Sequence, residues 1–377
     1  MKRRVLVAAA ALLAGAVVVP SDAAAPKSPS IGHLFVIELE NKGFDTTFGP
    51  GAPSYLARTL PAKGALLTQY FATGHASLDN YITQVSGQAA NMYTQADCQQ
   101  YFDVTPGAPV PDGSGQVSGQ GCVYPASVKT LADQVSAVGK SWHGYMEDLG
   151  ADPTREKATC GSPGSPSGTG TKDPTQSATA KDQYAARHNP FAYFHSLLDS
   201  GACDRNVGPL PRLATDLRQA STTPSFTWVT PDLCSDGHDA PCIDGRPGGL
   251  ASINAFLETW VPRITSSPAF RKDGLLVITF DEADASGDAS SCCGNPTGPN
   301  TPMPGITGPG GGRTGAVLLS PFITPGTRSD VAYDHYSALR SYEDLLGIRS
   351  GGTDGKGHLG YAARPGVTTF GPDVFRR

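Results

Sequence analysis

The chain has 377 residues and a formal net charge of −5. This length is enough to build one large α/β domain. The acidic balance, without basic runs, argues against nucleic acid as the main partner. An anionic small-molecule substrate is still compatible with this charge, because a bound metal ion can reverse the local field.

The N-terminus has the pattern of a secretory signal peptide. The basic residues of "MKRR" precede an apolar run, "VLVAAAALLAGAVVV", and the small residues of "SDAAA" follow it. We expect cleavage near Ala25, so that residues 1–25 are removed and residues 26–377 form a single secreted, extracellular domain. No later segment is apolar for long enough to cross a membrane, which predicts no stable membrane insertion.

All eight cysteines lie after residue 25. An even number of cysteines in an exported chain favours up to four disulfides. None of the spacings is CxxC, so zinc-ribbon chemistry is not indicated. The pairing stays open, because eight cysteines allow many connectivities.

Short buried strands alternate along the chain with amphipathic helices. The strand candidates are continuous, rich in β-branched or aromatic residues and bounded by turn or polar residues. They cover residues 33–39, 140–146, 224–230, 274–280 and 315–322. The helix candidates cover residues 126–139, 251–264 and 336–348. This alternation predicts an α/β fold, a three-layer α/β/α sandwich with a mostly parallel central sheet.

Acidic residues follow three of these strands. Glu40 and Asn41 come after "HLFVIEL", Asp281 and Glu282 come after "GLLVITF", and "PDLCSDGHD" follows "PSFTWVT". In open α/β sheets the ligand site lies outside the carboxyl ends of the strands, so these side chains are expected at one edge. Each segment alone reads equally well as a solvated turn. Three together predict a cation site, and their oxygen ligands suit a hard divalent ion such as Mg, Ca or Mn.

Two histidines accompany these acids. "PDLCSDGHD" contains His238 among Asp232, Asp236 and Asp239, and "YDHYSALR" places His335 just before a helix. Nearby carboxylates raise the pKa of a histidine, so either ring could hold a proton for a leaving oxygen. The alternative for the first segment is a disulfide-anchored loop whose acids face water.

The stretch "FATGHASLDNY" supplies a candidate nucleophile. Ser77 lies at or near a helix N-terminus, which favours phosphate oxygens, and a divalent ion would help its hydroxyl to attack phosphorus. Asn80, one turn further on, could donate its amide to a phosphoryl oxygen as charge develops. Alternatively, Ser77 only caps the helix, and Thr73 is the nearest substitute nucleophile.

Seven blocks, in order, resemble those of a known family: "VIELENKGFDTTFG", "HASLDNYITQVSG", "WHGYMEDL", "YAARHNPFAYF", "TWVTPDLCSDGHD", "VITFDEAD" and "DHYSALRSYEDLLGI". This is the bacterial phosphoesterase family of the alkaline phosphatase superfamily, which contains secreted acid phosphatases and phospholipases C. The Ser77 block is most similar to the secreted acid phosphatase and phosphatidylinositol-3-phosphatase branch, where His-Pro-Ser-x-Pro-Asn-Tyr is usual. Ala76 and Asp79 replace the two prolines.

The resemblance implies an alkaline-phosphatase-like fold and assigns roles to individual residues. Ser77 matches the nucleophile, with Asn80 beside it, and the implied metal ligands are Glu40, Asn41, Ser77, Asp281 and Glu282. His238 and His335 match histidines that face the phosphate or a second metal. His75 and His188 are taken as substrate-binding, although His188 could equally fix a loop. The superfamily's two-zinc members usually have Asp-His at the position of Asp281-Glu282, so the resemblance favours one oxygen-rich site, with Zn still among the candidate ions.

The sequence therefore predicts a secreted, metal-dependent phosphomonoesterase that resembles acid phosphatases and uses a phospho-enzyme intermediate. Its substrate would be a small phosphate ester, a phosphoinositide or another phospholipid. The alternative enzyme is a phospholipase C-type phosphodiesterase acting on phospholipid head groups, which would need a wider, more apolar entrance. An inactive surface-binding protein is a further alternative, but an inactive copy usually loses some ligands, and here all are present.

Overall fold

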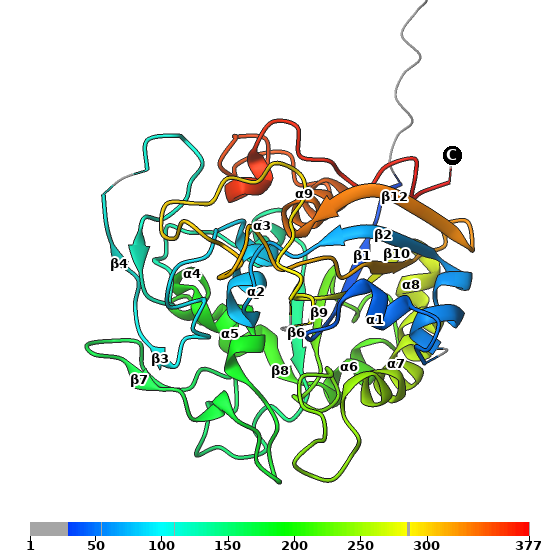
Figure 1. The fold of residues 1–377 in the computed structure, drawn as a ribbon, viewed down its shortest axis with the longest axis horizontal. Coiled ribbons are helices and arrows are strands. Elements are labelled where there is room, and N and C mark those ends of the chain that lie inside the picture. Colours follow the sequence, from blue (N-terminus) through cyan, green and yellow to red (C-terminus); the bar gives the residue numbers. More distant parts are fainter. Residues whose placement is uncertain (1–28, 54, 109, 285–286, 377) are drawn as a thin grey trace, which may run out of the picture.

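The computed structural model describes residues 29–53, 55–108, 110–284 and 287–376, and the predicted signal peptide lies outside them. One eight-stranded sheet crosses the described part of the chain in the order β12-β2-β11-β10-β1-β9-β6-β8 (Figure 1). Its strands are β1 (His33–Leu39), β2 (Ala65–Phe71), β6 (Trp142–Met146), β8 (Val207–Pro209), β9 (Phe226–Thr230), β10 (Gly274–Phe280), β11 (Ala316–Leu319) and β12 (Thr327–Asp334).

Helices cover both faces of this sheet, and β1 shows which helix covers which face. Successive side chains of a strand point to opposite faces. Leu34 and Val36 belong to one core cluster, together with residues of α2 (Ser77–Ser86), α3 (Leu131–Ala137) and α9 (His335–Leu345). Phe35 and Ile37 belong to a second cluster, together with residues of α6 (Pro211–Asp216), α7 (Gly249–Ser266) and α8 (Pro268–Asp273). The predicted three-layer sandwich is confirmed.

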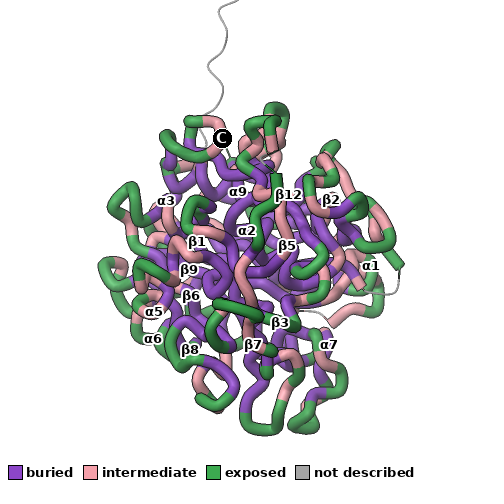
Figure 2. The backbone as a smooth tube through the Cα atoms, turned by 90° about the vertical axis from the view of Figure 1, so that its left-hand side faces the viewer, coloured by how far each residue is buried: buried purple, intermediate pink, exposed green. Residues whose placement is uncertain are grey.

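The remaining elements are short. Besides short 3-10 and π-helical turns, they are helices α1 (Phe44–Phe48), α4 (His195–Leu198) and α5 (Ala202–Asn206), the strand pair β3 (Gln100–Tyr101) and β7 (Thr171–Lys172), and the strand pair β4 (Thr105–Pro106) and β5 (Gly119–Gln120). Exposed residues lie mostly in loops and short outer segments, whereas the residues of α2, β9 and β10 are all buried (Figure 2). No helix among the described residues is long and apolar enough to cross a membrane.

The sheet is mostly parallel, as predicted, with one exception. β1 pairs in parallel with both β10 and β9, but β11 runs antiparallel to β10 and to β2. The reason is the connection: no helix lies among the described residues between β10 and β11 (281–284 and 287–315), so the chain re-enters the sheet from the edge at which β10 ended. The strands β2, β8 and β12 were not among the predicted segments. Since β1 lies between β9 and β10, the three acid-bearing strand ends are neighbours.

Four disulfides join all eight cysteines: Cys98–Cys122, Cys160–Cys203, Cys234–Cys242 and Cys292–Cys293. This agrees with the expectation of up to four bridges and supplies the pairing that the sequence left open. The Cys234–Cys242 bridge closes the loop that follows β9, so it bears directly on the site described below.

Candidate active site

The acids that follow the strands meet the N-terminus of α2 at one edge of the sheet. The Oγ of Ser77 donates a hydrogen bond to Oε2 of Glu40 at 2.8 Å, and the backbone N–H of Asn41 donates to Oδ1 of Asp281 at 2.9 Å. Asn41 has φ of 56°, a left-handed conformation in which asparagine is favoured among residues with a Cβ. The sequence prediction that these segments converge is confirmed, and every side chain in this group except that of Asn41 is buried.

Ser77 does not cap its helix. The N-cap position belongs to Ala76, which offers no side-chain hydrogen bond, and Oδ1 of Asp97 accepts the bond from the backbone N–H of Leu78 at 3.0 Å. The capping alternative for Ser77 is therefore not observed. Its hydroxyl is free of the helix backbone and points to a carboxylate, which is the arrangement that a nucleophile held by its base or by a shared cation would have.

A second set of ligand atoms lies on the other side of Glu40. One atom each from Glu40, His188 and Asp236 lies within 4.8 Å of the others, and all three residues are buried. Nδ1 of His188 is 3.0 Å from Oδ2 of Asp236, so Nδ1 carries the ring proton. Burial lowers the pKa of His188 well below its usual value, which leaves Nε2 as a lone pair, 3.4 Å from Oε1 of Glu40.

Two buried ligand atoms at this edge have no hydrogen-bond partner among the described residues, namely Oδ2 of Asp281 and Nε2 of His188. Burial, followed by repulsion from neighbouring carboxylates, raises the pKa of Glu40 well above its usual value, and burial likewise raises the pKa values of Asp281 and Asp236. Buried acceptors without a partner are costly unless a cation or a proton satisfies them. The donor set therefore fits a bound divalent metal ion.

Glu282 and His75 form a separate pair beside this group. Nδ1 of His75 is 3.0 Å from Oε2 of Glu282, and Nε2 of His75 is buried without a hydrogen-bond partner among the described residues. Burial raises the pKa of Glu282 well above its usual value and lowers that of His75. The structure thus brings Glu282 next to the predicted substrate-binding histidine, while Asp281 contacts Asn41.

Asn80 braces the loop before Ser77. Its Oδ1 accepts hydrogen bonds from the backbone N–H groups of Thr73 and Gly74, at 3.2 and 2.9 Å, and from the hydroxyl of Thr73. Its Nδ2 donates to the carbonyls of Gly74 and Ala76, at 2.9 and 3.0 Å. Both amide hydrogens are therefore committed to the backbone, so in this structure Asn80 positions the loop and offers no donor to a phosphoryl oxygen.

His335 is the clearest correction to the sequence predictions. Its ring is fully buried; Nε2 is 2.7 Å from the backbone carbonyl of Asp281 and Nδ1 is 3.1 Å from the hydroxyl of Tyr70. Burial lowers its pKa to about 4. The expectation of a raised pKa and a protonated ring at His335 is wrong, because desolvation lowers the pKa more than the hydrogen bond to the Asp281 carbonyl raises it. His335 supports the strand end that carries Asp281.

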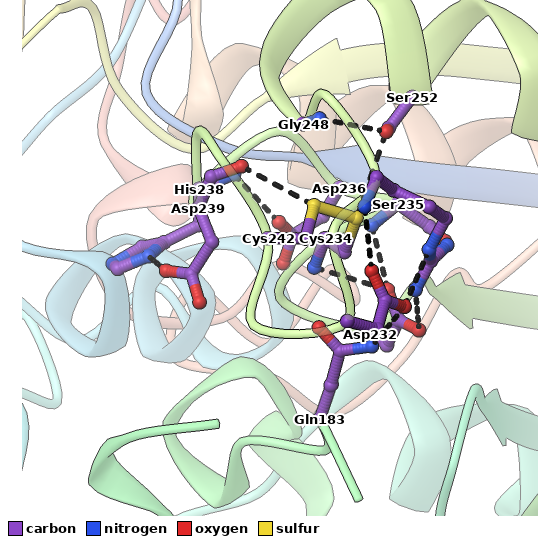
Figure 3. The surroundings of a disulfide bond; sticks show 12 residues. Gln183, Asp232, Cys234, Ser235, Asp236, His238, Asp239, Cys242, Gly248 and Ser252 are labelled. Atoms are coloured by element: carbon purple, nitrogen blue, oxygen red, sulfur yellow. Dashed lines mark hydrogen bonds and ion pairs between the residues drawn. A yellow bond between two sulfur atoms is a disulfide. The ribbon is translucent and has the colours of Figure 1, made fainter. Parts of the chain in front are cut away.

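His238 lies on the loop closed by the Cys234–Cys242 disulfide (Figure 3), and its side chain is partly exposed. Its Nδ1 is 2.7 Å from Oδ1 of Asp239, and its Nε2 is 3.1 Å from Nη2 of Arg187. A guanidinium nitrogen can only donate, so Nε2 of His238 accepts and its proton lies on Nδ1. With Arg187 in this position, Nε2 has no proton to give to a leaving oxygen.

Sequence reasoning left three residues of the site without a role. Arg187 is buried beside His188, Asp236 joins the second ligand set, and Tyr81 donates from its hydroxyl to Oε1 of Glu40 at 2.6 Å. Asp236 was visible as one of several acids in its segment, but nothing in the sequence distinguished it from its neighbours. Tyr81 had a usable signal, because a residue four positions after Ser77 shares its helix face.

The fold and the site together define the class of protein: an α/β/α protein with a mostly parallel sheet and a helix-borne serine that faces a buried carboxylate. The chain matches the phosphoesterase family over residues 54–349, and it belongs to that family. The resemblance drawn from the sequence blocks is thereby confirmed.

Individual relatives are distant. A phosphate-repressible acid phosphatase of Penicillium chrysogenum is 25% identical over 314 residues, which cover 83% of this chain and 58% of that protein. A phosphatidylinositol-3-phosphatase of Mycobacterium tuberculosis is 23% identical over 325 residues, which cover 86% of this chain and 80% of that protein. A solved protein of the alkaline phosphatase superfamily from Vibrio parahaemolyticus superposes with a TM-score of 0.44 at 13% identity, covering 86% of this chain and 68% of that one.

Proposed function

We propose that this protein is a secreted, metal-dependent phosphomonoesterase that resembles acid phosphatases and uses Ser77 as its nucleophile. The observation that carries the proposal is the 2.8 Å hydrogen bond from the Ser77 hydroxyl to Glu40, beside a buried Asp281 oxygen that has no hydrogen-bond partner in the described part of the chain. Membership of the phosphoesterase family and the acid phosphatase relatives support the reaction class.

The chain's own residues would divide the work as follows. Glu40 accepts the hydrogen bond from the Ser77 hydroxyl and so orients the serine oxygen for attack on phosphorus. The attack gives a phosphoserine and releases the alcohol. Water then cleaves the phosphoserine. Glu40, Asn41, Ser77 and Asp281 would hold a divalent cation, with Glu282 near them. That cation, whether Mg, Ca, Mn or Zn, would supply positive charge to the phosphoryl oxygens and lower the pKa of the hydroxyl.

In the state described, the histidines would bind the metal ion or the substrate rather than donate a proton, and His188 is the candidate metal ligand among them. His188 is fixed by Asp236 and His75 is fixed by Glu282, and neither Nε2 has a hydrogen-bond partner within the ranges that the structure describes. The sequence predicts that His238 donates a proton to the leaving oxygen. For that, Arg187 would have to move away from Nε2 of His238. Arg187 would then be available to an oxygen of the substrate.

The proposed substrate is a small phosphate ester or a phosphoinositide. The Penicillium relative is named as an acid phosphatase and the Mycobacterium relative as a phosphatidylinositol-3-phosphatase, and the monoester is the substrate type common to both. Export is supported by the signal-peptide pattern of residues 1–25 and by the four disulfides. A phospholipase C-type phosphodiesterase is the alternative, and the test below separates the two.

The test compares two chromogenic substrates with the purified mature protein. We expect p-nitrophenol release from p-nitrophenyl phosphate to exceed release from p-nitrophenylphosphorylcholine, and a chelator to abolish it until a divalent metal is restored. Faster cleavage of the phosphorylcholine ester would favour the diesterase. Turnover that survives exhaustive chelation, with no metal detected by elemental analysis, would refute the metal-dependent mechanism.

A further inference from the structure

We propose that Tyr81 is a positioning residue that fixes the Glu40 carboxylate, and with it the His188 ring, in the orientation that receives the metal ion. This inference rests on the proposed function, because it assigns Tyr81 a task only if Glu40 is a metal ligand. It concerns a residue that neither touches the reacting atoms nor follows from the acid and histidine pattern of the sequence.

The first observation is that one turn of α2 holds both oxygens of Glu40. The Tyr81 hydroxyl donates to Oε1 at 2.6 Å, and the Ser77 hydroxyl donates to Oε2 at 2.8 Å. Residues four apart lie on the same helix face, so the helix presents the candidate nucleophile and the clamp together. A carboxylate held at both oxygens cannot rotate about its own axis, which fixes the lone pairs that are left for a cation.

The second observation is the contact between Tyr81 and His188. Their rings stack with centroids 5.4 Å apart and planes 4° from parallel. Nε2 of His188 lies 3.4 Å from the same Oε1 that accepts the Tyr81 hydroxyl. Tyr81 therefore sets the position of two candidate ligands through two different contacts, a hydrogen bond to Glu40 and a ring face against His188.

Burial makes this arrangement costly to disturb. Tyr81, Glu40 and His188 are each no more than 1% exposed. Without the phenol, Oε1 of Glu40 would lose its short donor in a place that bulk water does not reach, and the carboxylate would turn or shift. Groups that orient metal ligands in this way typically change metal affinity or activity by roughly 10- to 100-fold when they are removed.

The experiment separates the hydroxyl from the ring. Tyr81→Phe keeps the stacked ring and deletes only the donor, whereas Tyr81→Leu deletes both contacts. The matched control is Tyr193→Phe, because the Tyr193 hydroxyl is also fully buried but has no hydrogen-bond partner among the described residues. Chelator-stripped wild type is first titrated with Mg²⁺, Ca²⁺, Mn²⁺ and Zn²⁺ by calorimetry, and the tightest-binding ion is then titrated into each variant. Circular dichroism checks that each variant is folded.

We expect Tyr81→Phe to bind the chosen ion about 10- to 100-fold more weakly than wild type, and Tyr81→Leu to bind it more weakly still. Tyr193→Phe should match wild type. At saturating metal, part of the kcat of Tyr81→Phe should return while KM stays near the wild-type value, which a merely structural role would not produce. A wild-type protein that binds none of the four ions overturns the proposed metal site itself. A folded Tyr81→Phe with wild-type affinity overturns only the role of Tyr81.

Discussion

The two sides of the candidate site are built differently. On one side, Glu40, Ser77 and Asp281 come from the ends of β1 and β10 and from the first turn of α2, and each is at most 4% exposed. On the other side, His238 comes from a loop closed by the Cys234–Cys242 bridge, with its side chain 32% exposed. Regular elements fix the first side through the register of the sheet, so it tolerates little change. The second side is held by the disulfide and a few local contacts, so we expect it to adapt more readily to a substrate.

Substitution of Ser77 tests the rigid side and carries the largest expected effect. Ser77→Ala should remove nearly all turnover, because among the described residues only the Tyr81 phenol also donates a hydroxyl to Glu40, and that phenol holds the opposite carboxylate oxygen. The fold should survive, because the variant loses one hydrogen bond worth on the order of 1 kcal/mol and no helix cap. Circular dichroism and p-nitrophenyl phosphate turnover provide the two measurements.

Thr73→Ala is the control for this experiment, since Thr73 is the nearest alternative nucleophile. Its hydroxyl donates to Oδ1 of Asn80, so the substitution should weaken the loop slightly and leave most of the turnover. A folded Ser77→Ala protein with near-normal turnover would show that the rigid side of the site is not where the reaction occurs.

Asn80 should produce the next largest effect. Asn80→Ala removes the acceptor and both donors that hold residues 73–76 in place, so Ser77 would shift relative to Glu40. A misplacement of this kind costs on the order of 10²-fold in rate. The buried backbone groups left without partners should also lower the free energy of unfolding by about 1–3 kcal/mol. Urea unfolding and kcat measure the two effects, and a loss of rate without any loss of stability would instead favour direct contact between Asn80 and the phosphoryl group.

Substitution of His238 tests the adaptable side, and the loss of rate should depend on the leaving group of the substrate. If His238 becomes a proton donor once Arg187 moves, His238→Ala should slow the hydrolysis of an alkyl phosphate by on the order of 10²-fold. The same variant should slow p-nitrophenyl phosphate much less, because p-nitrophenolate leaves without a proton. Steady-state rates on the two esters measure the contrast. Equal losses on both would assign His238 to binding the phosphate.

The sequence predicted the rigid side well, because strand periodicity and the position of acids after each strand are local signals with a fixed geometric meaning. β1 and β10 begin and end at the predicted residues, and Glu40 and Asp281 lie where the strand ends place them. The contacts of His335, Asn80 and His238 could not be predicted in the same way. Each depends on partners distant in the sequence, such as Tyr70 and Arg187, or on burial that reverses the expected pKa shift.

The last prediction concerns stability and uses His335, whose expected effect on turnover is the smallest. Burial gives the folded ring a pKa of about 4, below the usual value of 6.5 in the unfolded chain. Between these two values the unfolded chain binds a proton that the folded protein does not bind. The free energy of unfolding should therefore fall as pH falls from about 6.5 to about 4, by on the order of 3 kcal/mol from this group. Replacement of the ring in His335→Gln should flatten that part of the profile.

His358 provides a control of opposite sign. Hydrogen bonding to Asp344, followed by the bond to Asp354, raises the pKa of His358 despite its partial burial. Its contribution to stability is fully present below the unfolded value of 6.5 and is lost as pH rises through the raised folded value. His358→Gln should therefore be destabilised mainly at acid pH. It should make the free energy of unfolding fall more steeply as pH falls, whereas His335→Gln should make it fall less steeply. Urea unfolding of wild type and both variants at about pH 7.5, 6 and 4.5 measures how the free energy of unfolding changes with pH. These values sample the range between and above the pKa values of about 4 and about 6.5. Parallel profiles for all three proteins would show that neither histidine changes its protonation on folding, and would remove the physical argument for a neutral, structural His335.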